Sequence, residues 1–154
     1  MPRNQVSVIG SGSASEKARE EAYEVGQRLG NHGVNLVCGG GGGVMEAASR
    51  GISESEDGLA IGIRPETTDR MANEWLDVVI PSGIGQARNL SVVLSGRAII
   101  AISGSYGTLS EISLARKFEK DLFGIGTWQH ERFDFPTDLT PAEAVERAMN
   151  CLDA

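Results

Sequence analysis

The sequence contains few of the side chains that build metal centres and disulfide frameworks. Only two cysteines and two histidines occur among 154 residues. Cys38 and Cys151 lack the spacing of metal-ligand motifs, and two histidines are too few for a multi-histidine site. We therefore expect reduced thiols in a cytosolic chain and no metal. Apolar runs are also short, since none approaches the roughly 18 residues of a membrane span.

Basic residues are scarce as well. The chain has 14 Lys and Arg against 21 Asp and Glu, which gives a net charge of −7. Proteins that bind nucleic acids usually carry a basic surface, so we expect no nucleic-acid partner. The first five residues run directly into a strand-like segment and show no signal-peptide core or cleavage site. These features predict a cytoplasmic protein that does not bind membranes.

Short aliphatic runs alternate with helical patterns along the chain, whose length predicts one domain over residues 1–154. The runs are continuously apolar, which is typical of parallel strands covered on both faces. This alternation predicts an α/β fold with a doubly wound parallel sheet, a Rossmann-like three-layer αβα sandwich. The expected strands are residues 6–9, 34–38, 59–63, 77–80, 98–102 and, more weakly, 122–125. The expected helices are about 15–29, 44–53, 86–95, 108–119 and 140–151.

Two of these helices have recognisable starts. Ser13 and Glu16 have the spacing of a capping box ahead of the first helix. Thr140, Pro141 and Glu143 predict the start of the last helix, with proline at its first position.

Glycine is the abundant residue. The chain contains 20 glycines, about twice the average usage of ~7%. They cluster directly after the apolar runs, and in an open α/β sheet ligands bind beyond the carboxyl ends of the strands. The loops at this edge are therefore the candidate ligand site.

Loop one (residues 10–15) follows the first strand and contains Gly10, Ser11 and Gly12. Its spacing resembles the dinucleotide fingerprint, but Ser15 stands at the third glycine position and no acidic residue follows the second strand. A standard NAD site is therefore not expected. Either the loop contacts a phosphate or base at a helix N-terminus, or it is a tight turn.

Loop two consists of five consecutive glycines and leads to Met45. A simple turn needs one or two glycines, so five indicate that the backbone closely approaches a ligand or another loop. The Lys-Ser/Thr ending of a phosphate-binding P-loop is missing. The glycines are Gly39, Gly40, Gly41, Gly42 and Gly43.

Loop three (residues 81–85) places Arg88 in the first turn of the next expected helix. A cation there opposes the helix dipole, so helix stability does not explain it. An arginine at this position can complete an anion site with its paired donors. The alternative is an ordinary surface arginine.

Loop four (residues 103–108) follows the most apolar strand, and its backbone amides can cradle a phosphate at a helix N-terminus. The Thr108 hydroxyl can cap that helix or bind the phosphate. Glu111 is expected in the first turn of this helix, where its carboxylate can cap the helix or interact favourably with the helix dipole. The alternative is that it stabilises the oxocarbenium-like transition state of N-glycosidic bond cleavage. The phosphate-binding candidates are Gly104, Ser105, Tyr106, Gly107 and Thr108.

At these residues the chain resembles the LOG family. Residues 103–111, Ser-Gly-Ser-Tyr-Gly-Thr-Leu-Ser-Glu, are similar to its Pro-Gly-Gly-x-Gly-Thr-x-x-Glu motif, and residues 39–45 are similar to its Gly-Gly-Gly-x-x-Gly-Leu-Met segment. Arg88 and Glu111 match the catalytic arginine and glutamate of the family. The resemblance covers residues 6–119. It implies a phosphoribohydrolase that needs no cofactor and splits AMP-like nucleotides into base and ribose 5-phosphate. It also implies a homodimer or larger homo-oligomer.

The departures from the family motif point to a different branch. Asn89 stands where the family has lysine after the arginine, and Ser103 and Ser105 replace proline and glycine. These changes resemble the LOG-like branch that includes molybdenum cofactor carrier proteins. The alternative function is therefore a non-catalytic protein that binds or carries a nucleotide or the molybdenum cofactor. Lysine decarboxylation, an older label of the family, is excluded because no lysine lies in the glycine-rich loops.

Overall fold

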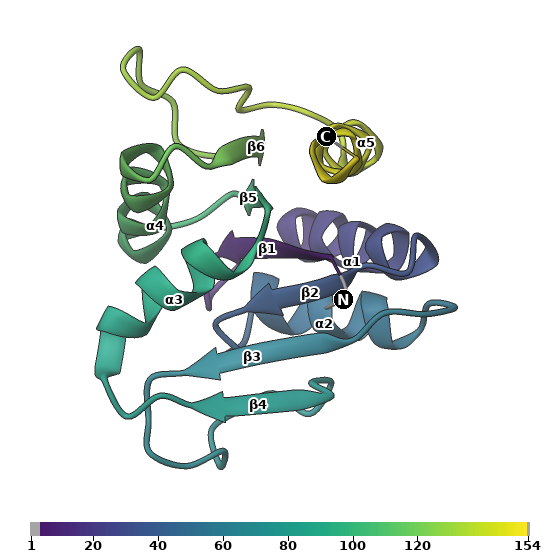
Figure 1. Cartoon of the computed structure of the whole chain (residues 1–154), viewed down its shortest axis with the longest axis vertical. Helices are drawn as coiled ribbons and strands as arrows, with labels where there is room; N and C mark the ends of the chain where they lie inside the picture. Colours follow the sequence, from purple (N-terminus) through teal and green to yellow (C-terminus); the bar gives the residue numbers. More distant parts are fainter. Residues whose placement is uncertain (1–3, 154) are drawn as a thin grey trace.

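A computed structural model describes residues 4–153 and shows a single α/β domain with a six-stranded, all-parallel sheet (Figure 1). The expected fold class is thus confirmed. The strands are β1 (Gln5–Gly10), β2 (Asn35–Cys38), β3 (Ala60–Arg64), β4 (Val78–Pro81), β5 (Ala98–Ile102) and β6 (Asp121–Ile125). The helices are α1 (Glu16–Asn31), α2 (Val44–Ser53), α3 (Arg88–Ser95), α4 (Tyr106–Lys117) and α5 (Pro141–Leu152), with a short 3₁₀ turn, η1 (Gly85–Ala87), before α3.

Helices cover both faces of the sheet and form two apolar cores. One core joins α1, α2 and α5 to residues such as Val8 and Ile100, and the other joins α3 and α4 to residues such as Ile9 and Ile99. Successive residues of a strand point to opposite faces, so a continuously apolar strand supplies both cores. This is why the aliphatic runs predicted the central strands correctly.

Strand β4 differs from the expectation of a strand covered on both faces. It lies at the edge of the sheet and pairs only with β3. Val78 and Ile80 are 40% and 44% exposed. An edge strand can carry the same aliphatic residues as a central one, so composition alone does not reveal its exposure.

Of the two helix caps predicted from the sequence, the structure confirms the one at α5 and contradicts the one at α1. At α5, Thr140 and Glu143 form the expected capping box behind Pro141. At α1 the expected box at Ser13 is wrong, because the helix begins at Glu16 and the hydroxyl of Ser15 accepts from the Ala18 amide. The Ser13 amide instead donates to the Ser11 hydroxyl within loop one.

The order of the strands fixes the position of the site. It runs β4-β3-β2-β1-β5-β6, so the chain winds away in opposite directions on either side of the β1–β5 pair. Beyond the carboxyl ends of two such strands a crevice opens between their loops. Loop one and loop four therefore face each other at the edge toward which the arrowheads of β1 to β4 point in Figure 1.

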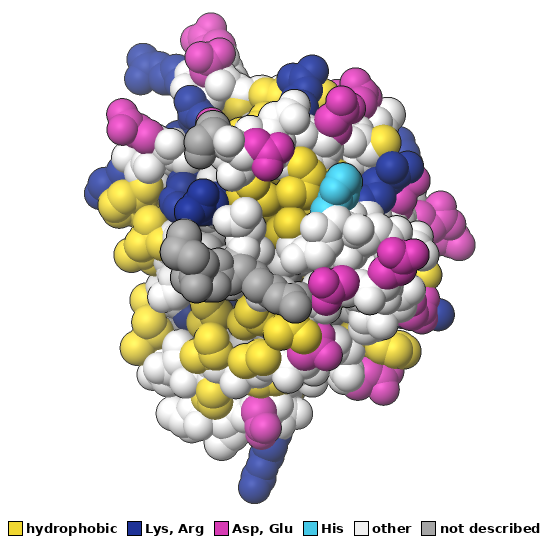
Figure 2. Space-filling model, turned by 45° about the vertical axis from the view of Figure 1, so that its right-hand side comes forward, with side chains coloured by type: hydrophobic (Ala, Val, Ile, Leu, Met, Phe, Trp, Pro, Cys, Tyr) yellow, Lys and Arg dark blue, Asp and Glu magenta, His cyan; other side chains and the backbone are white. Residues whose placement is uncertain are grey.

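The surface carries mixed charge. On the face shown in Figure 2, Lys and Arg side chains are interspersed with Asp and Glu and do not gather into one basic patch. Within residues 4–153 we find no helix whose length and apolar character would allow it to cross a bilayer.

Candidate functional site

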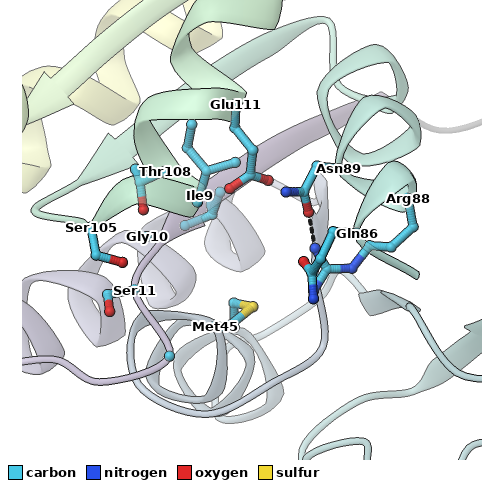
Figure 3. Close-up of a pocket in the computed structure, with 14 residues that line it drawn as sticks. Ile9, Gly10, Ser11, Met45, Gln86, Arg88, Asn89, Ser105, Thr108 and Glu111 are labelled. Atoms are coloured by element: carbon cyan, nitrogen blue, oxygen red, sulfur yellow. Dashed lines mark hydrogen bonds between the residues drawn. The ribbon is translucent and has the colours of Figure 1, made fainter.

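A cavity of about 140 Å³ lies at the β1–β5 crevice. Typical ligand pockets measure roughly 300–1,000 Å³, so the enclosed space holds only one part of a nucleotide-sized molecule. Figure 3 shows side chains of α4, Thr108 and Glu111, and side chains of α3, Arg88 and Asn89, around it, with Met45 of α2 below. The lining residues are Val8, Ile9, Gly10, Ser11, Gly12, Gly39, Met45, Gln86, Arg88, Asn89, Ser105, Gly107, Thr108 and Glu111.

The cavity brings together most of the residues singled out in the sequence. Arg88, Thr108 and Glu111 all line it, although they belong to two helices. Ten of the lining residues were candidates, while Val8, Ile9, Gln86 and Asn89 were not. Six candidates do not line this cavity, namely Gly40, Gly41, Gly42, Gly43, Gly104 and Tyr106.

The start of α4 leaves a buried donor free. The Thr108 side chain is 2% exposed, and its hydroxyl has no hydrogen-bond partner in the described chain. Gly104 has a φ of +117°, and a Cβ there would overlap the Thr108 side chain, so loop four needs glycine to fold onto this helix. The first N–H groups of a helix also lack intrahelical partners. Together these donors form a position suited to an anion.

Helix α4 begins two residues earlier than expected, at Tyr106. Thr108 therefore does not cap the helix, and Glu111 lies in the second turn. The predicted interaction of Glu111 with the helix dipole, which depended on a position in the first turn, is therefore wrong. Glu111 instead lines the cavity, so we infer that its carboxyl group serves the cavity and not the end of the helix.

Arg88 is the cation of the cavity. It is the first residue of α3 and only 8% exposed, so it is no ordinary surface arginine. One guanidinium nitrogen, Nη1, donates to the side-chain oxygen of Asn89, while the buried Nε has no partner. Burial lowers the pKa of Arg88 from its usual value, with Arg64 adding to this effect and Glu111 opposing it. Arginine remains charged in spite of such a shift.

Glu111 faces Arg88 across the cavity as a neutral acid. It is 7% exposed, and this burial raises its pKa to about 8, although the charge of Arg88 acts in the opposite direction. At neutral pH most molecules therefore hold a protonated carboxyl group here. A protonated carboxyl can donate a hydrogen bond to an anion that a carboxylate would repel.

Loop two approaches both loop one and Arg88. Gly43 has a φ of +60°, and a Cβ there would overlap the Ser11 carbonyl oxygen. A Cβ at Gly39 would lie 2.8 Å from Nη2 of Arg88. The glycines thus allow one backbone to pass close to another and leave room for the guanidinium.

A second arginine, which the sequence reading missed, holds loop two in place. The Arg64 guanidinium donates to the Gly39 carbonyl oxygen at 3.3 Å and pairs with the Glu66 carboxylate at 2.7 Å. Asn73 donates to the Gly41 carbonyl oxygen at 2.9 Å. Arg64 ends β3 at the same sheet edge as the candidate loops, and an arginine closing an apolar strand was the available signal.

Tyr106 turns away from the cavity toward the other side of loop four. It is 82% exposed, and its ring lies 6.1 Å from that of Trp128. The Trp128 indole donates to the Ser105 carbonyl oxygen at 3.0 Å. These two rings support loop four from outside.

The described part of the chain offers no metal centre. Within residues 4–153, no group of three or more His, Cys, Asp and Glu side chains is arranged to hold a metal ion. Cys38 and Cys151 are both free thiols. The cavity itself is lined by hydrogen-bond donors, one guanidinium and one carboxyl group.

Comparisons with known proteins agree with this architecture. The structure superposes on the molybdenum cofactor binding protein of Rippkaea orientalis with a TM-score of 0.89 and 30% identity, over 99% of each chain. An uncharacterized protein of Archaeoglobus fulgidus is 42% identical over 73% of this chain and 74% of its own length. A probable cytokinin riboside 5'-monophosphate phosphoribohydrolase of Oryza sativa subsp. japonica is 32% identical over 70% of this chain but only 46% of its own length. The model of the SLOG cluster4 family matches residues 3–149. The chain therefore belongs to the SLOG cluster4 family, which confirms the resemblance to LOG proteins.

Proposed function

We propose that the protein binds and carries a phosphate-bearing, nucleotide-like ligand, and that this ligand is the molybdenum cofactor. The observation that carries the proposal is the pair of buried, unpartnered donors, Arg88 Nε and Thr108 Oγ1, on the wall of one cavity. Buried donors without partners are costly unless a ligand satisfies them. The likeness to the Rippkaea orientalis protein, which extends over the whole fold, supports the choice of cargo.

The phosphate end of the ligand suits the enclosed space. Its oxygens would accept from the first amides of α4, from the Thr108 hydroxyl and from Arg88. Protonated Glu111 adds a donor and no negative charge. The small enclosed volume leaves the planar ring system of a pterin or purine outside, along loop one and loop two.

Replacing Thr108 tests the proposal directly. Because Thr108→Val keeps the shape of the side chain and removes only an unpartnered hydroxyl, we expect stability to stay equal or rise. We expect binding of inorganic phosphate and AMP, measured by titration calorimetry, to weaken about tenfold, as for one hydrogen bond to a charged group. Ser110→Ala, at an exposed position of the same helix, is the matched control. Equal phosphate affinity of Thr108→Val and wild type would contradict the proposed site.

A second candidate function is hydrolysis of nucleoside 5'-monophosphates. It is favoured by one observation, namely that Arg88 and Glu111, which match the catalytic pair of LOG proteins, line the same cavity. In this reaction water adds across the glycosidic bond, so that the base leaves with a proton and ribose 5-phosphate remains. Catalysis would need the ionised form of Glu111, whose carboxylate can stabilise the oxocarbenium-like transition state.

Incubation with AMP separates the two functions. Chromatography of the mixture should show AMP unchanged if the protein is a carrier. Adenine released by the wild type and not by Glu111→Gln would instead establish the hydrolase. Because burial raises the pKa of Glu111 to about 8, any hydrolysis should increase from pH 6 to pH 9.

We also propose that the protein forms a homo-oligomer through the face of β4, η1 and α3. Residues 78–96 contain one charged side chain, Arg88, and it is buried. The exposed apolar residues here are Val78 and Ile80 on β4, Ile84 just before η1, and Leu94 on α3. Two copies that each carry a charge of −7 repel each other least where they meet through an uncharged apolar surface.

Sedimentation velocity tests this interface. We expect the wild type to sediment as a dimer or larger assembly, and Leu94→Asp to sediment as a folded monomer, because a buried charge without a partner opposes association. Leu59→Asp, at an apolar position exposed outside this face, should leave the assembly intact. A monomeric wild type would contradict the proposal.

A further inference from the structure

We propose that Asn89 is a positioning residue that holds Arg88 away from Glu111 and thereby keeps the guanidinium charge free for an anionic ligand. This inference deepens the proposed function of the same site. It concerns a neutral residue that accepts a hydrogen bond from Arg88 and whose amide points toward Glu111.

The hydrogen bonding of Arg88 fixes the orientation of the Asn89 amide. A guanidinium has only donors, so the group that Nη1 contacts must be the Asn89 oxygen. The amide nitrogen then lies on the other side of the group. Figure 3 shows this nitrogen pointing toward the Glu111 carboxyl group, so that the amide stands between the cation and the acid. Asn89 is 6% exposed, so its amide lies inside the fold beside the two groups.

Arg88 and Glu111 do not form a direct ion pair. Among the ion pairs of residues 4–153, none joins these two side chains. The contrast with Arg64 is informative, because that guanidinium is held by the carboxylate of Glu66 and its charge is compensated. The side chain that holds Arg88 is neutral, so Arg88 keeps an uncompensated charge at the cavity wall.

Other charged and titratable groups near the pair do not replace Asn89. Arg64 and Glu66 act on Arg88 from the β3 side, and the buried thiol of Cys38 interacts electrostatically with both Arg88 and Glu111. Burial raises the pKa of the Cys38 thiol, which therefore stays neutral. Asn89 is thus the group that separates the cation from the acid.

The titration of Glu111 tests the inference without any ligand. The probe is the side-chain carboxyl ¹³C signal of labelled glutamate, assigned by its loss in Glu111→Gln. The wild type should titrate near pH 8. In Asn89→Ala the released guanidinium can reach the carboxylate, and the midpoint should fall by more than one pH unit. In Asn89→Asp the guanidinium stays held and a like charge is added beside Glu111, so the midpoint should not fall.

These opposite responses separate positioning from general loosening of the fold. Proton–nitrogen spectra of each variant verify that the protein is folded. If Asn89→Ala does not fold, Asn89→Ser provides a second truncation of the same side chain. An unchanged midpoint in the folded truncation, or an equal fall in Asn89→Asp, would overturn the inference.

Phosphate binding supplies a second readout. Asn89→Ala should bind inorganic phosphate roughly tenfold more weakly, because Glu111 then competes for Arg88. Adding Glu111→Gln to this variant removes the competitor and should restore binding. If the double variant binds no better than Asn89→Ala, the inference is wrong. Failure of the proposed function would look different, since the wild type would then not bind phosphate while the titration result would still stand.

Discussion

Glu111→Gln should make the protein more stable at alkaline pH, while removing a residue of the site. We expect the free energy of unfolding at pH 8 to 9 to rise by about 5 kcal/mol, because burial raises the pKa from 4.5 to about 8 and a shift of one pKa unit corresponds to about 1.4 kcal/mol. Below pH 5 the variant and the wild type should differ little. Stability gained by removing a side chain is a mark of a residue retained for function.

The sign follows from the two pKa values of this group. In the unfolded chain Glu111 titrates at 4.5, and burial raises its pKa in the folded protein to about 8. Between these values the folded state holds a proton that the unfolded state has lost, so stability decreases as the pH rises. Glutamine resembles the protonated acid at every pH, so the variant lacks this loss.

Urea denaturation at pH 5, 7 and 9 measures the effect. Glu146→Gln is the control, because Glu146 is exposed on α5. It should reproduce the pH dependence of the wild type. If the free energy of unfolding decreases with rising pH to the same extent in the wild type and in Glu111→Gln, Glu111 is ionised in the folded protein and the expected stabilisation is wrong.

Arg88→Lys should abolish most ligand binding although it keeps the positive charge. Lysine has neither the Nε–H that is unpartnered in the cavity nor the second nitrogen that contacts Asn89. A planar fork of donors matches a phosphate in a way that a single ammonium group does not. We expect phosphate affinity to fall at least about a hundredfold, which corresponds to about 3 kcal/mol.

Titration calorimetry with inorganic phosphate checks this result. Arg97→Lys, at an exposed arginine just beyond α3, should bind like the wild type. If Arg88→Lys also binds like the wild type, the site requires only a positive charge, and the specific role of the guanidinium is wrong.

The sequence predicted the fold because its central strands are covered on both faces. Continuous aliphatic runs such as residues 98–102 have one structural solution in an alternating α/β chain. Strand β4 shows the limit of this reasoning, because Val78 and Ile80 have the same character but lie at an edge. The composition of a strand does not show whether it pairs with one neighbouring strand or with two.

The candidate site was predictable where a motif surrounded it. Arg88, Thr108 and Glu111 were found because glycine-rich loops precede their helices, and the cavity contains all three. Neither Asn89 nor Arg64 was predicted as a site residue. An amide beside an arginine, or a cation at the end of a strand, occurs in many proteins for reasons unrelated to a ligand site. Their roles depend on side chains from other elements.

The electrostatic state of the site could not be read from the chain. The raised pKa of Glu111 arises from burial between helices and strands distant in sequence. The start of α4 at Tyr106 moved Glu111 from the first turn to the second, which changed its role from a helix-end charge to a cavity group.

The proposed function depends above all on a phosphate group in the cavity between α3 and α4. A crystal structure of the protein with AMP or the molybdenum cofactor bound tests it most directly. We expect phosphate oxygens within hydrogen-bond distance of Thr108 Oγ1 and Arg88 Nε, at the N-terminus of α4. A ligand whose phosphate lies elsewhere, with both donors still unpartnered, would contradict it.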